Sequence, residues 1–303
     1  MPIVDSQIHI WEDARMSPQH RQIPTYSMDD ALKEMAEAGV DAAVIHPPST
    51  LGEKVNELAV DAVRRHPDKF CILGHFDLQS ADREAIVKNW RQRPGMLGFR
   101  FTFNQPHQQS WWTDGSLDWF WAACEREKLP VGLLAGGHMA AFAKIAERHP
   151  GLKLHIDHMG RHGGAGGAKD DAAFADLGEM LAVAKYPNVA LKLSGAPRYS
   201  SEPYPYRNIH EYIRQMFDAF GPQRCFWGTD ITRMPCFVSA MRNDVHRRAA
   251  VAAGPRQGAG HGPGRLRLAR LEAPSLITEP DYGAGSPSGS DAAPSLPGAS
   301  AAA

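Results

Sequence analysis

The sequence has few cysteines and no excess of either charge. Four of its 303 residues are cysteine, and none of them has the paired spacing of zinc-binding or redox motifs. The formal net charge is -1, so nothing suggests nucleic acid or an anionic membrane as a partner. No apolar run reaches the ~18 residues of a membrane span, and Met1 leads directly into an apolar strand. We therefore expect a cytoplasmic enzyme for a small molecule; its oligomeric state is left open, a homo-oligomer included.

Aromatic residues almost disappear after residue 236. From there on only Phe237 and Tyr282 are aromatic, while Ala, Gly, Pro, Ser and Arg dominate. Such a composition buries too little apolar surface to offset chain entropy. We therefore divide the chain into a folded domain, 1–236, and a low-complexity, disordered tail, 237–303. Read with synonymous codons one nucleotide later, residues 245–262 spell FTEELPWLPGPDKELVMG, a helix-like string, and we hypothesise a one-base insertion near codon 237.

The first 236 residues repeat one unit: an amphipathic stretch, a Pro or Gly stop, and a short apolar run. Ser27 and Asp30 are spaced as a capping box at the start of the first helix, and Gly39 ends it. The expected strands are 3–10, 41–46, 70–76, 96–103, 131–135, 153–157, 189–194 and 225–229. Eight strands with seven helices between them predict a (β/α)8 TIM barrel in which the tail replaces the eighth helix.

Polar residues stand where several of these strands run into loops, at Asp5-Ser-Gln-Ile-His9, His155-Ile-Asp-His158 and Trp227-Gly-Thr-Asp230. Parallel barrel strands deliver their last side chains to one rim, so these groups should converge. Alternation of side chains along a strand assigns inward and outward faces. We expect His155 to pack outward and Asp157 to hold a loop. The residues expected to face inward are Asp5, Gln7, His9, Gly98, Arg100, Thr102, Ala190, Lys192, Ser194, Phe226, Gly228 and Asp230.

The chain resembles the amidohydrolase-related branch of the amidohydrolase superfamily, which includes lactonases for sugar acids and for 2-pyrone-4,6-dicarboxylate. The resemblance spans roughly residues 1–236 and rests on MPIVDSQIHIWE, GFRFTF, HIDHMG, VALKLSG and WGTDITRM. It matches His9 to the second histidine of the strand-one motif Asp-x-His-x-His, His158 to the strand-six histidine and Asp230 to the strand-eight aspartate that activates water. These matches imply that His9, His158 and Asp230 are catalytic.

One departure from the family pattern bears on the metal. Gln7 stands where the first histidine is expected, and an amide is a poorer ligand than an imidazole. A two-metal site is therefore not expected. A single divalent ion such as zinc, held by His9, His158 and Asp230, and a site without metal both remain open.

The resemblance implies hydrolysis of a lactone or a related carbonyl substrate. Asp230 would take a proton from the attacking water, while His9 and His158 polarise the carbonyl. The remaining candidates would bind a carboxylated substrate; for Arg100 the alternative is pairing with a buried carboxylate such as Asp5. These substrate-binding candidates are Gln7, Arg100, Arg161 and Lys192, with Arg161 in a glycine-rich lid, 160–167.

Two other functions stay open. The same family contains metal-dependent decarboxylases of aromatic acids, which an assay for carbon dioxide would separate from lactonases. The chain could also be an inactive, truncated barrel, because loss of the closing helix would expose apolar surface.

Overall fold

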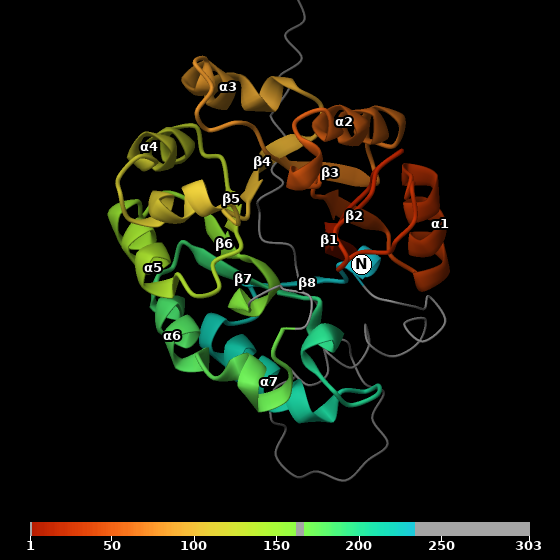
Figure 1. Cartoon of the computed structure of the whole chain (residues 1–303), viewed down its shortest axis with the longest axis vertical. Helices are drawn as coiled ribbons and strands as arrows, with labels where there is room; N and C mark the ends of the chain where they lie inside the picture. The colour runs from red at the N-terminus through yellow and green to blue at the C-terminus, as the bar shows by residue number, and fades with distance from the viewer. Residues whose placement is uncertain (1, 162–166, 234–303) are drawn as a thin grey trace, which may run out of the picture. The chain divides into compact units, whose positions relative to one another are not determined.

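The computed structural model describes residues 2–161 and 167–233. In them eight parallel strands follow one another in chain order around a nearly closed barrel (Figure 1). The strands are β1 (Val4–Ile8), β2 (Ala42–Ile45), β3 (Phe70–Gly74), β4 (Met96–Phe101), β5 (Val131–Leu133), β6 (Leu154–Ile156), β7 (Val189–Ser194) and β8 (Cys225–Gly228). The expected TIM barrel is confirmed. The tail, the missing eighth helix and the hypothesised insertion concern 237–303, which lies outside the described residues.

Seven α-helices lie between successive strands and surround the sheet (Figure 1). They are α1 (Met28–Ala38), α2 (Val55–Arg65), α3 (Arg83–Asn89), α4 (Asp118–Arg126), α5 (Met139–Arg148), α6 (Leu177–Ala182) and α7 (His210–Phe220). Short 3-10 helices follow several strands, among them η4 (Asp157–Gly160) after β6 and η9 (Ile231–Arg233) after β8. Loops at this end of the strands therefore carry the ends of the three sequence motifs.

Local sequence signals explain where the first helix begins and ends. Ser27 caps α1 through a full capping box with Asp30, and Gly39 ends the helix in the left-handed conformation at φ 72°. The two sequence predictions for this helix are confirmed.

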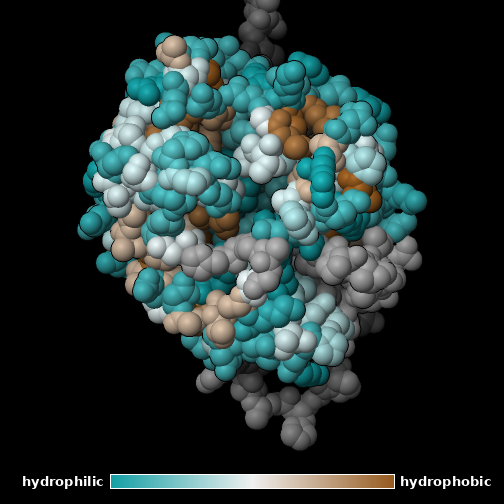
Figure 2. All heavy atoms as spheres, viewed as in Figure 1, coloured by the Kyte–Doolittle hydropathy of each residue, from teal (hydrophilic) through white to brown (hydrophobic). Residues whose placement is uncertain are grey.

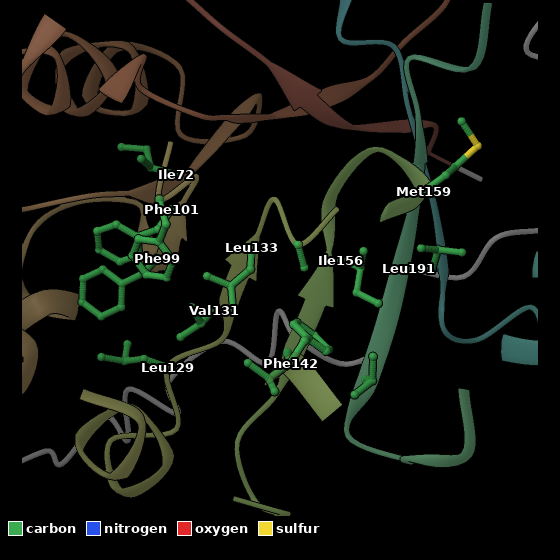
Figure 3. Close-up of a cluster of buried hydrophobic side chains, with 14 of the residues drawn as sticks. Ile72, Phe99, Phe101, Leu129, Val131, Leu133, Phe142, Ile156, Met159 and Leu191 are labelled. Atoms are coloured by element: carbon green, nitrogen blue, oxygen red, sulfur yellow. The ribbon is translucent and has the colours of Figure 1, made fainter. Parts of the chain in front are cut away.

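The hydrophobic core lies between the strands and the surrounding helices. Phe99 and Phe101 on β4 belong to this buried cluster (Figure 3). Both rings contact Phe120, and the ring centroids of Phe99 and Trp90 lie 4.3 Å apart. Arg100, between the two phenylalanines, consequently faces the barrel interior. This alternation agrees with the sequence prediction for β4.

The first and last strands meet at a seam that is held by few bonds. The backbone N–H of Asp230 donates to the carbonyl of Gln7 (2.9 Å), and the backbone N–H and hydroxyl of Thr229 both donate to the carboxylate of Asp5. The pairing of β1 with β2 shifts by one residue between Asp5 and Ile8. This extra residue places Asp5 on the helix-facing side together with Ile8. The prediction that Asp5 points inward with Gln7 and His9 is therefore wrong.

The molecular face in Figure 2 is mostly hydrophilic, with small hydrophobic patches. Among the described residues the large hydrophobic side chains that are well exposed are Ile3 (43%) and Ile23 (39%). None of the helices in this part of the chain is long and apolar enough to span a bilayer.

Candidate active site

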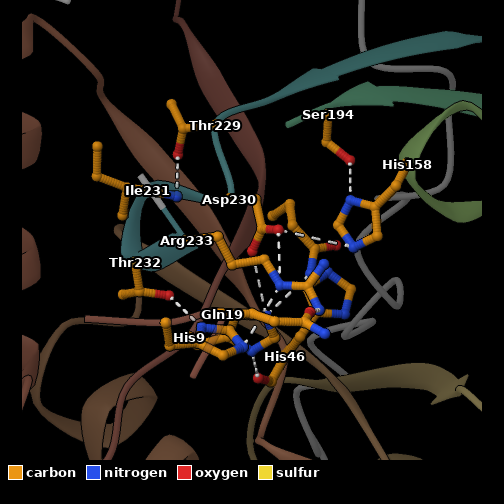
Figure 4. A network of polar contacts seen from close by, with 12 residues as sticks. His9, Gln19, His46, His158, Ser194, Thr229, Asp230, Ile231, Thr232 and Arg233 are labelled. Atoms are coloured by element: carbon orange, nitrogen blue, oxygen red, sulfur yellow. Dashed lines mark hydrogen bonds and ion pairs between the residues drawn. The ribbon is translucent and has the colours of Figure 1, made fainter. Parts of the chain in front are cut away.

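A buried carboxylate lies at the rim of the barrel, where three motifs from distant parts of the sequence meet. Asp230 follows β8 and is 1% exposed. Its Oδ1 lies 3.4 Å from Nε2 of His9, and its Oδ2 lies 3.8 Å from Nε2 of His158 and 3.3 Å from Nε of Arg233 (Figure 4). The structure thus brings together His9, His158 and Asp230, the three residues expected to be catalytic.

The backbone is strained where two of these side chains leave their strands. His158 has φ 50° and Asp230 has φ 54°, both in the left-handed region that costs a residue with a side chain about 1–3 kcal/mol. Gly195 has φ 68°, and a side chain there would come within 3.8 Å of both Asp230 and His158. Strain of this kind gathers at functional sites.

In both histidines Nε2 faces Asp230, while Nδ1 contacts another residue on the opposite side of the ring. Nδ1 of His9 lies 2.6 Å from the carbonyl of His46, and Nδ1 of His158 lies 2.9 Å from the hydroxyl of Ser194. Such outer partners set the orientation and the tautomer of a functional imidazole. Burial lowers the pKa of His158 to about 3, although the Asp230 carboxylate acts to raise it. His158 is therefore neutral at physiological pH.

Arg233 was not predicted from the sequence, and it supplies a positive charge beside the carboxylate. Its guanidinium also donates to Oε1 of Gln19 (2.7 Å), in the loop between β1 and α1. Burial by itself would raise the pKa of Asp230, but the charge of Arg233 holds that pKa well below its usual value. Asp230 is consequently an ionised carboxylate near neutral pH. No pattern in the sequence marks Arg233, because it comes from the short η9 turn and not from a strand.

A second group of polar residues fills the barrel interior and is called the interior cluster here. Its members are Gln7, His46, Arg100, His155, Asp157 and Lys192. Asp157 is fully buried; its Oδ2 accepts from Nε of Arg100 (2.7 Å) and its Oδ1 lies 3.1 Å from Nζ of Lys192. Nζ of Lys192 also lies 2.8 Å from Oε1 of Gln7 and 2.9 Å from Nε2 of His46. Two cations thus face one carboxylate.

The charges of the interior cluster shift its pKa values. Burial would raise the pKa of Asp157, but Lys192 and Arg100 hold it well below its usual value. Burial lowers the pKa of Lys192 to about 8, against the charge of Asp157, which acts to raise it. Near pH 7 the interior therefore keeps an excess of positive charge.

Two expectations for residues at the end of β6 are corrected. His155 faces the interior, because it is in register with Gly132 and through it with Arg100, and its Nε2 lies 3.4 Å from Asp157. Asp157 is paired with the two interior cations and does not serve mainly as a loop tether. The two errors have one cause: β6 ends at Ile156 and the chain then turns left-handed at His158, so counting back from His158 assigns the wrong face.

Arg161 is anchored to the loops around it. It is 2% exposed, and its guanidinium donates to the carbonyls of Met159 and Ala173 and pairs with Asp176. Its Nη2 has no hydrogen-bond partner among the described residues, so substrate binding by Arg161 stays a prediction. The rest of the expected lid, 162–166, lies outside the described residues.

The donor atoms around Asp230 fit a single divalent cation. Oδ1 of Asp230 and Nε2 of His158 are buried without a hydrogen-bond partner among the described residues, and Nε2 of His9 is turned toward the same carboxylate. Two imidazoles and a carboxylate are ordinary ligands of zinc. Across 2–161 and 167–233, however, no three such side chains are spaced as a preformed metal site. The three residues have suitable chemistry, and an ion would have to draw them closer.

A family model described as amidohydrolase matches residues 4–257. The chain belongs to the amidohydrolase family. It is 25% identical over 237 residues to an L-fucono-1,5-lactonase of Burkholderia ambifaria, covering 75% of this chain and 79% of that protein. It is also 27% identical over 226 residues to a 4-sulfomuconolactone hydrolase of Hydrogenophaga intermedia, covering 73% of this chain and 70% of that protein. The family match and the two relatives together show that this amidohydrolase is a hydrolytic enzyme, as its sequence motifs indicate.

Solved structures share the barrel. An amidohydrolase from Burkholderia multivorans, solved with bound zinc, superposes with a TM-score of 0.71 at 19% identity, covering 83% of this chain and 92% of that one. A 2,6-dihydroxybenzoate decarboxylase from Rhizobium superposes with a TM-score of 0.52 at 15% identity, covering 82% and 97% of the two chains. At these identities the likeness establishes the fold of this amidohydrolase and leaves its reaction to the site.

Proposed function

We propose that this amidohydrolase hydrolyses a lactone that carries a carboxylate or another anionic group. The observation that carries the proposal is the ionised, buried Asp230 at the barrel rim, flanked by Nε2 of His9 at 3.4 Å and Nε2 of His158 at 3.8 Å. The two curated relatives, a fuconolactonase and a sulfomuconolactone hydrolase, both open lactone rings according to their names. Ring opening is thus the reaction that the site and the relatives jointly favour.

In the proposed mechanism Asp230 takes a proton from water as the water attacks the lactone carbonyl. His158 faces the same space with an unpartnered Nε2 and would orient the water or the carbonyl oxygen. A divalent ion, when bound, would be held by His9, His158 and Asp230, would polarise the carbonyl and would lower the pKa of water. The proton on Asp230 then passes to the departing alkoxide as the C–O bond of the ring breaks.

The excess of positive charge selects the substrate. Arg100 and Lys192 together oppose the single charge of Asp157, and Arg233 stands beside Asp230. Among the described residues Arg100 pairs with Asp157 through Nε, and its two terminal nitrogens would take a substrate carboxylate in a bidentate pair. A neutral lactone would form no ion pair with these cations.

Hydrolysis of a panel of sugar-acid and dicarboxylate lactones, followed by acid release, tests the proposal. Asp230→Asn keeps the shape but removes the proton acceptor, and we expect kcat to fall by about 10²–10⁴-fold. Arg100→Met should raise KM for carboxylated lactones more than for neutral ones. Asp218→Asn, on the exposed face of α7, is the matched control. Full activity of Asp230→Asn would remove the assigned base.

Decarboxylation of an aromatic acid is the second candidate, favoured by the metal-binding chemistry of His9, His158 and Asp230. Incubation with hydroxybenzoates, with and without added zinc or manganese, separates it from the first. Carbon dioxide release without lactone hydrolysis would establish the second function and reject the first.

A further inference from the structure

A chain of buried contacts leads from the interior cluster to the rim. Nζ of Lys192 lies 2.8 Å from Oε1 of Gln7, and Nε2 of Gln7 lies 3.3 Å from Nε2 of His9. The exposed fractions of the three residues are 2%, 0% and 3%, so bulk water does not compete for these contacts. Gln7 therefore connects the interior charge to a histidine beside Asp230.

The donor and acceptor roles along this chain follow from the chemistry of its two ends. A lysine amine points its N–H groups at its partners, so the oxygen of the Gln7 amide must face Lys192 and the NH₂ group must face His9. At the other end the carbonyl of His46 can only accept, so Nδ1 of His9, 2.6 Å away, carries the proton. Both ends give the same result: Nε2 of His9 is the unprotonated nitrogen.

The position of Lys192 keeps this arrangement in place. Nζ has two further partners, Oδ1 of Asp157 at 3.1 Å and Nε2 of His46 at 2.9 Å. The hydrogen bond to Oε1 of Gln7 and the ion pair with Asp157 are both buried, so the amine cannot turn away from Gln7 without giving up a buried bond. The orientation of the Gln7 amide is consequently determined by a charge network that does not itself contact Asp230.

We propose that Lys192 and Gln7 are positioning residues that hold His9 as the Nδ1–H tautomer, with the lone pair of Nε2 occupied by the NH₂ group of Gln7. His9 then cannot donate to Asp230: Nε2 and Oδ1 lie 3.4 Å apart, and Oδ1 has no hydrogen-bond partner among the described residues. Oδ1 is thereby kept available to accept from a water molecule or to bind a cation. The chain thus prepares a binding position for the attacking water or for a metal ion, and this role rests on the proposed function.

Gln7→Glu separates this role from simple packing, because the two side chains have nearly the same shape. A glutamate keeps an oxygen toward Lys192 but presents a second oxygen, in place of NH₂, to His9. Nε2 of His9 must then carry a proton to donate to that oxygen. His9 would then carry a proton on Nε2 next to Oδ1 of Asp230, while the fold is preserved.

The tautomer can be read without any substrate. We would label the protein with ¹⁵N-histidine, assign His9 by its loss in His9→Asn, and compare wild type, Gln7→Glu and the control Gln92→Glu, whose side chain is exposed. We expect an unprotonated Nε2 signal of His9 in wild type and in the control, and a protonated one in Gln7→Glu. In the lactone assay kcat of Gln7→Glu should fall at least about 10-fold with little change in KM.

A second pair of variants covers the case in which Gln7→Glu does not fold. Lys192→Met leaves the Gln7 oxygen without its donor, so part of the Gln7 amides should flip their oxygen toward His9 and give a partly protonated Nε2 signal, and Lys192→Arg, which keeps a donor, should restore the wild-type pattern. Unchanged His9 signals in both Gln7→Glu and Lys192→Met would overturn the proposal. Because the spectrum needs no turnover, failure of the lactone panel would reject the proposed function and leave this test intact.

Discussion

Asp157→Asn is the change that most directly tests the physics of the barrel interior. Asp157 is fully buried and is the carboxylate that faces both Arg100 and Lys192, at 2.7 and 3.1 Å. Asparagine has nearly the same volume but no charge. Two buried cations would then share no counter-charge within their cluster.

The expected loss of stability is large. Removing one partner of a buried ion pair typically costs about 3–5 kcal/mol, because the remaining charge stays desolvated. Asp157 has two such partners, so we expect the upper part of that range, which corresponds to a fall in Tm of roughly 10–20 °C for a domain of this size. Chemical denaturation monitored by circular dichroism measures the loss of unfolding free energy, and a thermal melt measures the fall in Tm.

The pH dependence provides an independent check. The pKa of Asp157 lies well below its unfolded value in the folded protein, so its stabilising contribution is present above about pH 4. It is lost as the pH falls through the folded-state pKa. The difference in unfolding free energy between wild type and Asp157→Asn should therefore be constant from pH 5 to 7 and shrink below about pH 4.

Two further variants test whether the loss of stability comes from the unpaired buried charge. Adding Lys192→Met to Asp157→Asn removes one of the unpaired cations and should recover part of the loss. Asp218→Asn removes an exposed charge and should leave Tm unchanged. A loss below about 1 kcal/mol in Asp157→Asn, or no recovery in the double variant, would refute the reasoning from buried charge.

Three shorter predictions follow from other contacts. Between about pH 8 and pH 10 the unfolding free energy of wild type should rise by roughly 2 kcal/mol relative to Lys192→Met, because the folded-state pKa of Lys192 is about 8 and the unfolded chain then binds more protons; parallel curves would argue against a buried amine. Thr229→Val should cost about 1–3 kcal/mol through the hydroxyl that donates to Asp5, and Thr229→Ser much less; equal losses would count against that bond. Gly195→Ala should cost about 1–2 kcal/mol in denaturation, since its φ is 68°; a neutral effect would mean that the turn relaxes.

Strand order and the rim triad were predictable from sequence because both follow from repetition. Each Pro or Gly stop marks the end of a helix, and a parallel strand after it can only join the same sheet. His9, His158 and Asp230 follow directly after three such strands, so the shared rim of the barrel brings them near one another. The left-handed turns that aim His158 and Asp230 into the site were not predictable from the strand pattern.

The failures of the sequence analysis occur where strand alternation breaks. One extra residue in β1 turns Asp5 outward, and a left-handed turn after β6 separates the face of His158 from that of His155. Arg233 comes from a loop, where no periodicity indicates direction. Alternation is a rule for regular strands, and it fails at bulges and turns.

The seam between β1 and β8 carries the proposed chemistry as well as the closure of the barrel. Asp230 donates its backbone N–H across this seam to Gln7, and the neighbouring Thr229 ties down Asp5. Any thermal breathing that parts the two edges would pull the carboxylate away from His9 while the other strands stay paired. Heating should therefore abolish enzymatic activity at temperatures at which most of the molecule is still folded.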